Sequence, residues 1–203
     1  MKVVFLDRDG VINEFPGNGL YVTKVSGFHF LPRTLKALKL LTDAGYHIFV
    51  ISNQAGVGKG VFSKDKLDKI TAHMLKGVKA AGARIDDVFY CTCKSSAGCH
   101  CRKPRIGNII KALKGIDKPL DAARHAYFVG DTEGDIKTGK NAGCKTIFTL
   151  SGREDQEYMN RWDVRPDHTV EDLYDAVAII LKEDPYPSRE RGRRASQGSG
   201  SGL

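Results

Sequence analysis

The chain has 203 residues, of which 41% are hydrophobic and 28% are charged, a composition typical of a globular protein. It contains no apolar run near the roughly 18 residues of a membrane span and no signal-peptide core at its start, so we expect a cytoplasmic protein that does not bind membranes. The net charge of +8 includes +3 from the segment after residue 184. Charge of this size is compatible with an anionic substrate, with nucleic acid or with a well-solvated surface.

The first predicted element is a short strand at residues 3–6, Val-Val-Phe-Leu, whose four apolar residues in a row are typical of a strand buried on both faces. Asp7 and Asp9 follow directly, and Gly10 closes the turn. Ligands of open α/β sheets bind beyond the carboxyl ends of the strands. The two carboxylates therefore mark a candidate site, although a solvated surface turn would have the same sequence.

Strand and helix patterns alternate along the rest of the chain, which predicts a doubly wound, Rossmann-like, mostly parallel α/β sheet. A long loop over residues 14–30 precedes the first helix and is a candidate substrate loop. The later strands are predicted at residues 46–51, 88–90, 126–129 and 145–150. The helices are predicted at residues 32–44, from the N-cap Ser63 to 81, at 106–114, up to 142 and at 171–182, the last with Thr169 as its cap.

Polar residues follow three of these later strands. They are Ser52 with Asn53, Arg102 with Lys103, and Asp131 with Asp135. Because parallel strands end at the same edge of a sheet, we expect these side chains to lie near Asp7 and Asp9. The glycine-rich stretch at residues 56–60 lacks the spacing of a nucleotide-binding P-loop and is not interpreted as one.

Four of the five cysteines lie within eleven residues, as Cys91-x-Cys93 followed by Cys99-x-Cys101. Four soft ligands in two tight pairs suit a closed tetrahedral zinc site. The alternative is a loop of four free thiols, whereas a disulfide framework does not fit a cytosolic chain. Cys144 lies in an apolar segment and is expected in the core.

Taken together, these residues resemble the four motifs of the haloacid dehalogenase (HAD) superfamily of phosphotransferases. Asp7-Arg8-Asp9-Gly10 is similar to the first motif and Ser52 to the second. Lys103 in Cys-Arg-Lys-Pro is similar to the third, and Gly130-Asp131-x-x-x-Asp135 to the fourth. The resemblance covers the chain to about residue 180 and implies a phosphatase domain over residues 1–184. The basic Ser/Gly-rich tail over residues 185–203 is expected to be disordered.

The resemblance also implies the chemistry. Asp7 would attack the phosphorus atom and form an aspartyl-phosphate, while Asp9 would act as general acid and then as general base. Mg²⁺ would bind the Asp7 carboxylate, the Asp9 backbone carbonyl and Asp131, with Asp135 in direct or indirect contact. The residues implied to bind the phosphoryl oxygens are Ser52, Asn53 and Lys103.

A cysteine loop directly before Arg-Lys-Pro resembles one HAD subgroup (subfamily IIIA), the heptose 1,7-bisphosphate phosphatases and histidinol-phosphate phosphatases. That subgroup carries a histidine where this chain has Cys93, so an all-cysteine structural zinc site is implied and His100 is not expected to bind. By the same resemblance, the loop with Asn18 and Tyr21 and the side chain of Arg102 would contact the sugar or its second phosphate.

The first sequence motif and its neighbours resemble the heptose enzymes more closely, which favours removal of the C7 phosphate of D-glycero-D-manno-heptose 1,7-bisphosphate by a monomer. Histidinol phosphate is the alternative substrate. A further hypothesis, of another class, is an inactive zinc-stabilised protein that binds nucleic acid through its basic tail. The presence of Asp7, Asp9, Lys103 and Asp131 argues against it, so we do not expect nucleic acid as a partner.

Overall fold

The computed structural model describes residues 1–184. Its strands form one six-stranded sheet in the order β3-β2-β1-β4-β5-β6, and all neighbouring strands are parallel. This is the strand order of the Rossmann type of doubly wound sheet, which confirms the predicted fold class. The strands are β1 (Val3–Leu6), β2 (His47–Asn53), β3 (Asp87–Cys91), β4 (Tyr127–Gly130), β5 (Lys145–Thr149) and β6 (His168–Val170).

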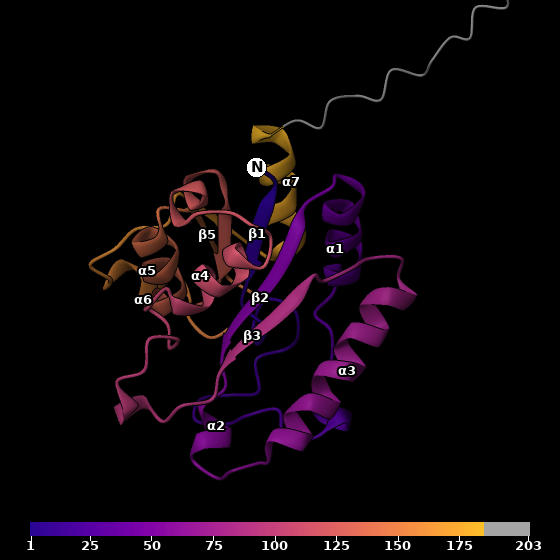
Figure 1. The fold of residues 1–203 in the computed structure, drawn as a ribbon, viewed down its shortest axis with the longest axis vertical. Helices are drawn as coiled ribbons and strands as arrows, with labels where there is room; N and C mark the ends of the chain where they lie inside the picture. The colour runs from indigo at the N-terminus through magenta and orange to yellow at the C-terminus, as the bar shows by residue number, and fades with distance from the viewer. Residues whose placement is uncertain (185–203) are drawn as a thin grey trace, which may run out of the picture.

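Helices cover both faces of this sheet (Figure 1). They are α1 (Thr34–Asp43), α2 (Ala55–Gly58), α3 (Lys64–Ala80), α4 (Gly107–Lys114), α5 (Glu133–Ala142), α6 (Gln156–Asn160) and α7 (Leu173–Glu183). Short 3-10 helices occur at Val25–Gly27, Ser95–Ala97 and Leu120–His125. In residues 1–184, no helix combines the length and the apolar character needed to cross a membrane.

The alternation of side chains along β1 divides the core into two layers. Val4 and Leu6 pack in the cluster that includes residues of α1, α3 and α7. Val3 and Phe5 pack on the opposite face, in the cluster that includes residues of α4. All four residues are fully buried, which explains why β1 is an uninterrupted apolar run.

Two predicted caps have different outcomes. The Ser63 side chain accepts a hydrogen bond from the backbone N–H of Lys66 and caps α3, as predicted. The cap of the last helix is Asp172 and not Thr169, because Asp172 accepts from the backbone N–H groups of Tyr174 and Asp175. Thr169 instead belongs to β6, a three-residue strand that the sequence pattern did not reveal.

β1 positions the site because it pairs with β2 on one side and with β4 on the other. The chain therefore winds in opposite directions from this point, and a crevice opens beyond the carboxyl ends of the central strands. Asp7 directly follows β1 at this crevice. The predicted disorder of residues 185–203 concerns a segment outside the described residues.

Candidate active site

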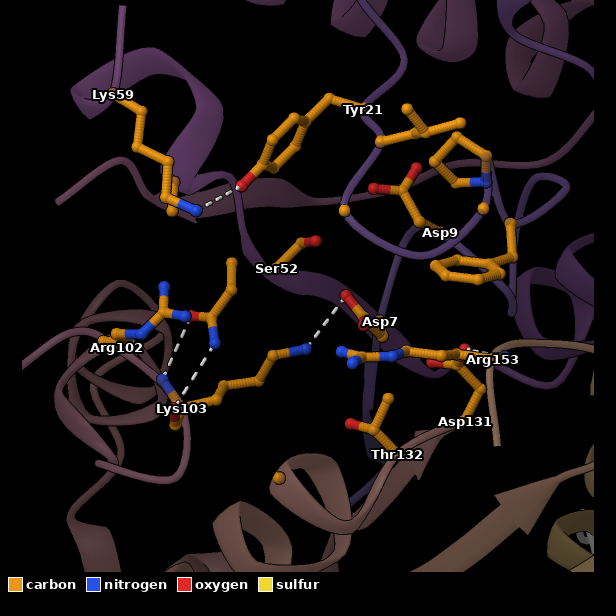
Figure 2. Close-up of a pocket in the computed structure, with 18 residues that line it drawn as sticks. Asp7, Asp9, Tyr21, Ser52, Lys59, Arg102, Lys103, Asp131, Thr132 and Arg153 are labelled. Carbon is orange, nitrogen blue, oxygen red and sulfur yellow. Dashed lines mark hydrogen bonds and ion pairs between the residues drawn. The ribbon is translucent and has the colours of Figure 1, made fainter. Parts of the chain in front are cut away.

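Residues from all four sequence motifs meet in a cavity of about 310 Å³ beyond the carboxyl ends of the strands. Asp7 lies after β1 and Asp131 after β4, and the backbone N–H of Asp7 donates to the carbonyl of Val129 at 3.0 Å. Most of the predicted site residues line the cavity: Asp7, Asp9, Tyr21, Ser52, Asn53, Arg102, Lys103 and Asp131. Figure 2 shows them converging from separate segments of the chain.

Lys103 crosses the floor of this cavity. Its Nζ lies 2.9 Å from Oδ1 of Asp7 and 2.5 Å from Oδ1 of Asp135, and the pair with Asp7 is visible in Figure 2. Burial opposes the charged form of Lys103, but attraction by Asp135 and Asp7 raises its pKa overall. Burial raises the pKa of Asp7 to about 6 against the attraction of Lys103. The lysine is therefore charged and directed at the predicted nucleophile.

Asp131 is held mainly by close backbone contacts. Its Oδ2 accepts a hydrogen bond of 2.7 Å from the backbone N–H of Arg153. A Cβ atom at Gly10 or at Gly152 would collide with this carboxylate, so both backbones must lack a side chain here. Gly10 also has a φ of +88°, a conformation that glycine adopts without strain. The other oxygen, Oδ1, is buried without a hydrogen-bond partner in residues 1–184.

Three carboxylates form a potential metal site, since one oxygen each from Asp7, Asp131 and Asp135 lies within 4.8 Å of the others. Burial and the charges of Asp135 and Asp7 raise the pKa of Asp131 well above its usual range. Such crowding of oxygen ligands, with one carboxylate oxygen unpartnered, fits a hard divalent cation. Asp135 is committed elsewhere as well, because its Oδ2 accepts from the backbone and the hydroxyl of Thr132 and caps α5.

Asp9 lines the cavity in a network of hydrogen-bond donors. Arg8 donates from Nη2 to both carboxylate oxygens at 2.9 Å and from Nε to Oδ1 at 3.1 Å. Nδ2 of Asn13 donates to Oδ1 at 2.9 Å, and Nε2 of Gln54 donates to Oδ2 at 2.8 Å. The carboxyl group is therefore held from several sides at once.

The other two predicted phosphate-binding residues lie at the end of β2. Ser52 is 2% exposed and accepts a hydrogen bond of 3.3 Å from Gln54. The Asn53 side chain accepts from the backbone N–H of Lys103 at 3.1 Å and donates to its carbonyl at 3.3 Å. Asn53 thus fixes the backbone that carries Lys103.

Basic side chains from distant segments surround the mouth of the cavity. Lys59 donates to the hydroxyl of Tyr21 at 3.2 Å, and Arg153 donates to Oδ1 of Asn18 at 3.2 Å. Both basic residues line the cavity, as does Arg102, whose Nη1 is buried without a hydrogen-bond partner in the described part of the chain. Asn18 does not itself line the cavity but holds one of the residues that do.

The cysteine cluster lies on the segment between β3 and Lys103. The Sγ atoms of Cys91, Cys93, Cys99 and Cys101 lie within 4.8 Å of one another, and no disulfide joins these thiols. Without a metal ion the thiols share protons: burial raises the pKa of Cys91 and a hydrogen bond with Cys99 raises that of Cys93, while the pKa of Cys99 is lowered, despite its burial, by hydrogen bonds from the neighbouring thiols. Thiolate is the form that binds zinc. His100 is exposed and is not part of the cluster as described in residues 1–184.

Sequence reasoning missed several residues that shape this site. Arg8 and Gln54 adjoin motif residues, and that adjacency was the available signal for the network around Asp9. Lys59 was not considered separately from the glycine-rich stretch at residues 56–60; it is the C-cap residue of α2, beside the cavity. Arg153 was considered together with Arg105 and Asp117, but no sequence pattern ranked it above them, because its contact with Asn18 joins residues 135 positions apart.

Comparisons with known proteins agree with this geometry. Residues 100–176 match the model of the HAD-hydrolase-like family. The D-glycero-beta-D-manno-heptose-1,7-bisphosphate 7-phosphatase of Haemophilus ducreyi is 35% identical over 186 residues, covering 88% of this chain and 98% of that protein. The alpha-anomer 7-phosphatase of Photorhabdus laumondii is 34% identical over 157 residues, covering 74% of this chain and 82% of that protein.

Solved structures agree as well. A D,D-heptose 1,7-bisphosphate phosphatase from B. bronchiseptica, complexed with magnesium and phosphate, has a TM-score of 0.81 at 28% identity, covering 90% of this chain and 99% of that chain. The enzyme of the same name from Burkholderia thailandensis has a TM-score of 0.64 at 27% identity, covering 89% of this chain and 99% of that chain.

The fold, the cavity and these relatives define an enzyme of the phosphatase class. The chain belongs to the HAD-like phosphatases, as its four sequence motifs predicted.

Proposed function

We propose that this protein hydrolyses a phosphomonoester with Mg²⁺ through an aspartyl-phosphate on Asp7, and that its substrate is D-glycero-D-manno-heptose 1,7-bisphosphate, cleaved at C7. The single observation that carries the proposal is that one cavity holds a buried Asp7–Lys103 pair at its floor and three basic side chains around it. The Asp7–Lys103 pair suits a transferring phosphoryl group. The three basic side chains suit another anionic group of the same substrate. The names of the relatives support this substrate.

In the first step, a carboxylate oxygen of Asp7 forms a bond to phosphorus while the bond from phosphorus to the sugar oxygen breaks. Asp9 gives its proton to the leaving alkoxide, and Lys103 neutralises charge on the phosphoryl oxygens. In the second step, Asp9 takes a proton from water as the water oxygen attacks phosphorus, which releases inorganic phosphate and restores Asp7. Ser52 is suited to donate a hydrogen bond to the phosphoryl group from the end of β2.

Asp7, Asp131 and the backbone carbonyl of Asp9 would hold Mg²⁺, and the unpartnered Oδ1 of Asp131 fits this role. When bound, the ion supplies charge stabilisation at the phosphoryl oxygens. Asp135 is better suited to holding Lys103, because one of its oxygens pairs with Lys103 and the other caps α5.

The second phosphate is assigned to Lys59, Arg102 and Arg153 at the cavity wall. Arg102 is the strongest candidate of the three, because its buried Nη1 lacks a hydrogen-bond partner in residues 1–184. Tyr21 and Asn18 position Lys59 and Arg153 respectively. The sugar would lie between the two anionic groups, next to the loop at residues 15–21.

We further propose that the four cysteines bind a structural zinc ion. The closeness of the four Sγ atoms supports this assignment. The zinc would stabilise the loop that leads into Arg102 and Lys103. Elemental analysis of the purified protein tests it, with about one zinc per chain expected and a metal-free loop contradicting it.

The decisive experiment measures phosphate release with Mg²⁺ from both anomers of the heptose bisphosphate, fructose 1,6-bisphosphate, histidinol phosphate and a 3′-phosphorylated oligonucleotide. We expect kcat/KM for one heptose anomer to exceed the others by about 100-fold, the scale of discrimination that misplaced contacts to an ill-fitting substrate produce. Preference for histidinol phosphate would overturn the substrate and keep the mechanism. Inactivity on the whole panel would contradict the proposed function.

A further inference from the structure

The residue between the two motif aspartates, Arg8, is completely buried. A buried guanidinium is costly unless it is paired and hydrogen-bonded. Its partner is the neighbouring carboxyl group of Asp9, which it bridges through Nε and Nη2. A guanidinium group stays protonated in proteins even when it is buried. Arg8 is thus a permanent cation behind the predicted acid and base.

Arg8 also contacts a residue of β3, the strand at the edge of the sheet. Its guanidinium carbon lies 5.6 Å from the ring centre of Tyr90 on β3, within the range of a cation–π interaction. The hydroxyl of Tyr90 is hydrogen-bonded at 2.9 Å to that of Thr71 on α3. The orientation of Arg8 is therefore set by elements that lie outside the catalytic cavity.

The Asp9 side chain keeps one accessible side. It is 17% exposed and lines the cavity, whereas Arg8 has no exposed surface. Rotation of the carboxyl group would break the two-oxygen bridge to Arg8 and the hydrogen bonds from Asn13 and Gln54. One carboxyl orientation is held while its cavity side stays open to a ligand.

We propose that Arg8 is a positioning residue that aims the Asp9 carboxyl group at the leaving-group oxygen, an inference that rests on the proposed acid–base role of Asp9. Arg8 does not touch the substrate and transfers no proton. Its effect is confined to the step in which Asp9 protonates the departing alkoxide and to the later step in which Asp9 accepts a proton from water.

Leaving groups of different basicity separate this role from a merely structural one. An alkoxide needs a proton as it leaves, whereas 4-nitrophenolate leaves without one, so a misplaced acid affects only the first. The value of kcat/KM covers the steps up to leaving-group departure and excludes the later attack of water. We therefore compare kcat/KM for the sugar phosphate with kcat/KM for 4-nitrophenyl phosphate.

We expect Arg8→Met to lower kcat/KM for the sugar phosphate by about 100-fold, the size of a loss of general acid catalysis. The kcat/KM for 4-nitrophenyl phosphate should change much less. Arg8→Lys retains a buried cation without the planar two-oxygen bridge and should recover part of the loss. Asp9→Asn should show the same asymmetry. The double variant Arg8→Met/Asp9→Asn should lose no more than Asp9→Asn alone, because both changes remove one function.

The matched control is Arg84→Met. Arg84 also holds structural partners, donating to the carbonyl of Tyr46 at 2.6 Å and to Asp86 at 3.2 Å, and it does not line the cavity. This variant should lower stability without changing the ratio of the two kcat/KM values. If Arg8→Met does not fold, Arg8→Lys carries the same comparison with a smaller expected effect.

Equal losses on both substrates in a folded Arg8 variant would overturn the inference, as would a double variant whose losses multiply. Failure of the proposed phosphatase mechanism gives a different result, because wild-type protein would then release phosphate from neither substrate. If only the proposed substrate is wrong, the alkyl phosphate that wild-type protein prefers takes the place of the sugar phosphate in the same comparison. If wild-type protein is active and Asp9→Asn loses more kcat/KM on the sugar phosphate than on 4-nitrophenyl phosphate, the same two values for the Arg8 variants decide the inference.

Discussion

The carboxylate cavity and the cysteine loop both collect side chains that suit metal ions, yet the chain holds them in opposite ways. Asp7 and Asp131 follow neighbouring strands of the central sheet and are 8% and 1% exposed. Of the cysteines, Cys91 ends β3 and is buried, while the other three lie on a loop and are partly exposed.

This difference indicates that a metal ion in the cavity and a metal ion in the cysteine loop would have different roles. Backbone pairing between β1 and β4 places the carboxylates, so their arrangement does not need an ion, and an ion there serves chemistry. The regular structure between β3 and α4 is a single short 3-10 helix, Ser95–Ala97, so an ion bound there would contribute to folding of the loop. Substitutions in the cavity should therefore lower turnover more than substitutions in the cysteine loop.

The largest effect is expected for Asp7→Asn. The amide has nearly the same shape but is not nucleophilic, so turnover should fall by about four orders of magnitude or more. The melting temperature should not fall, because burial already disfavours the charged form of Asp7. Phosphate release and thermal unfolding check both parts. Asp43→Asn, at an exposed ion pair with Lys39, is the control and should keep full activity. Wild-type turnover in Asp7→Asn would contradict the covalent mechanism.

Lys103→Met should have the next largest effect. Removal of the ammonium leaves the buried Asp7 and Asp135 without their shared cation, so we expect kcat to fall by about 10²–10³-fold and stability to fall by about 3 kcal/mol. Steady-state kinetics and denaturant unfolding measure the two losses. A variant that loses activity at unchanged stability would show that Lys103 contributes less to the architecture of the site than its contacts indicate.

Cys99→Ser addresses the other region. Loss of one thiolate should remove zinc and lower the melting temperature by about 5 °C, with a loss of turnover much smaller than for Lys103→Met. Cys144→Ser is the matched control, because Cys144 is buried in the core. It should lower stability while zinc content stays unchanged. Full zinc occupancy in Cys99→Ser would contradict the four-cysteine site.

The smallest effect is expected for Arg102→Met. Arg102 belongs to both regions, because it follows the cysteine loop and lines the cavity. Loss of one charge-assisted contact should lower kcat/KM for the bisphosphate by about tenfold, mainly through KM. Activity on a sugar monophosphate should change little. An equal loss on both substrates, measured side by side, would assign Arg102 to the transferring phosphoryl group.

The sequence by itself determined five of the six strands and the residue types at their ends. Runs such as Val3–Leu6 show burial on both faces directly, and the aspartates and Lys103 stand at fixed offsets from their strands. Short-range chemistry also identified the cap Ser63 and the paired cysteines. These features depend on neighbours along the chain, which is why they can be predicted without a structure.

Only the tertiary structure decided which distant residues share one environment. The contact between Arg153 and Asn18 joins residues 135 positions apart, and the ring of Tyr90 reaches Arg8 through the packing of β3 at the edge of the sheet. β6 is three residues long and lacks a periodic pattern, so it exists because β5 offers a free edge. Strand order and burial are collective results of packing. They place Arg8 behind Asp9, and this placement makes Arg8 a candidate positioning residue.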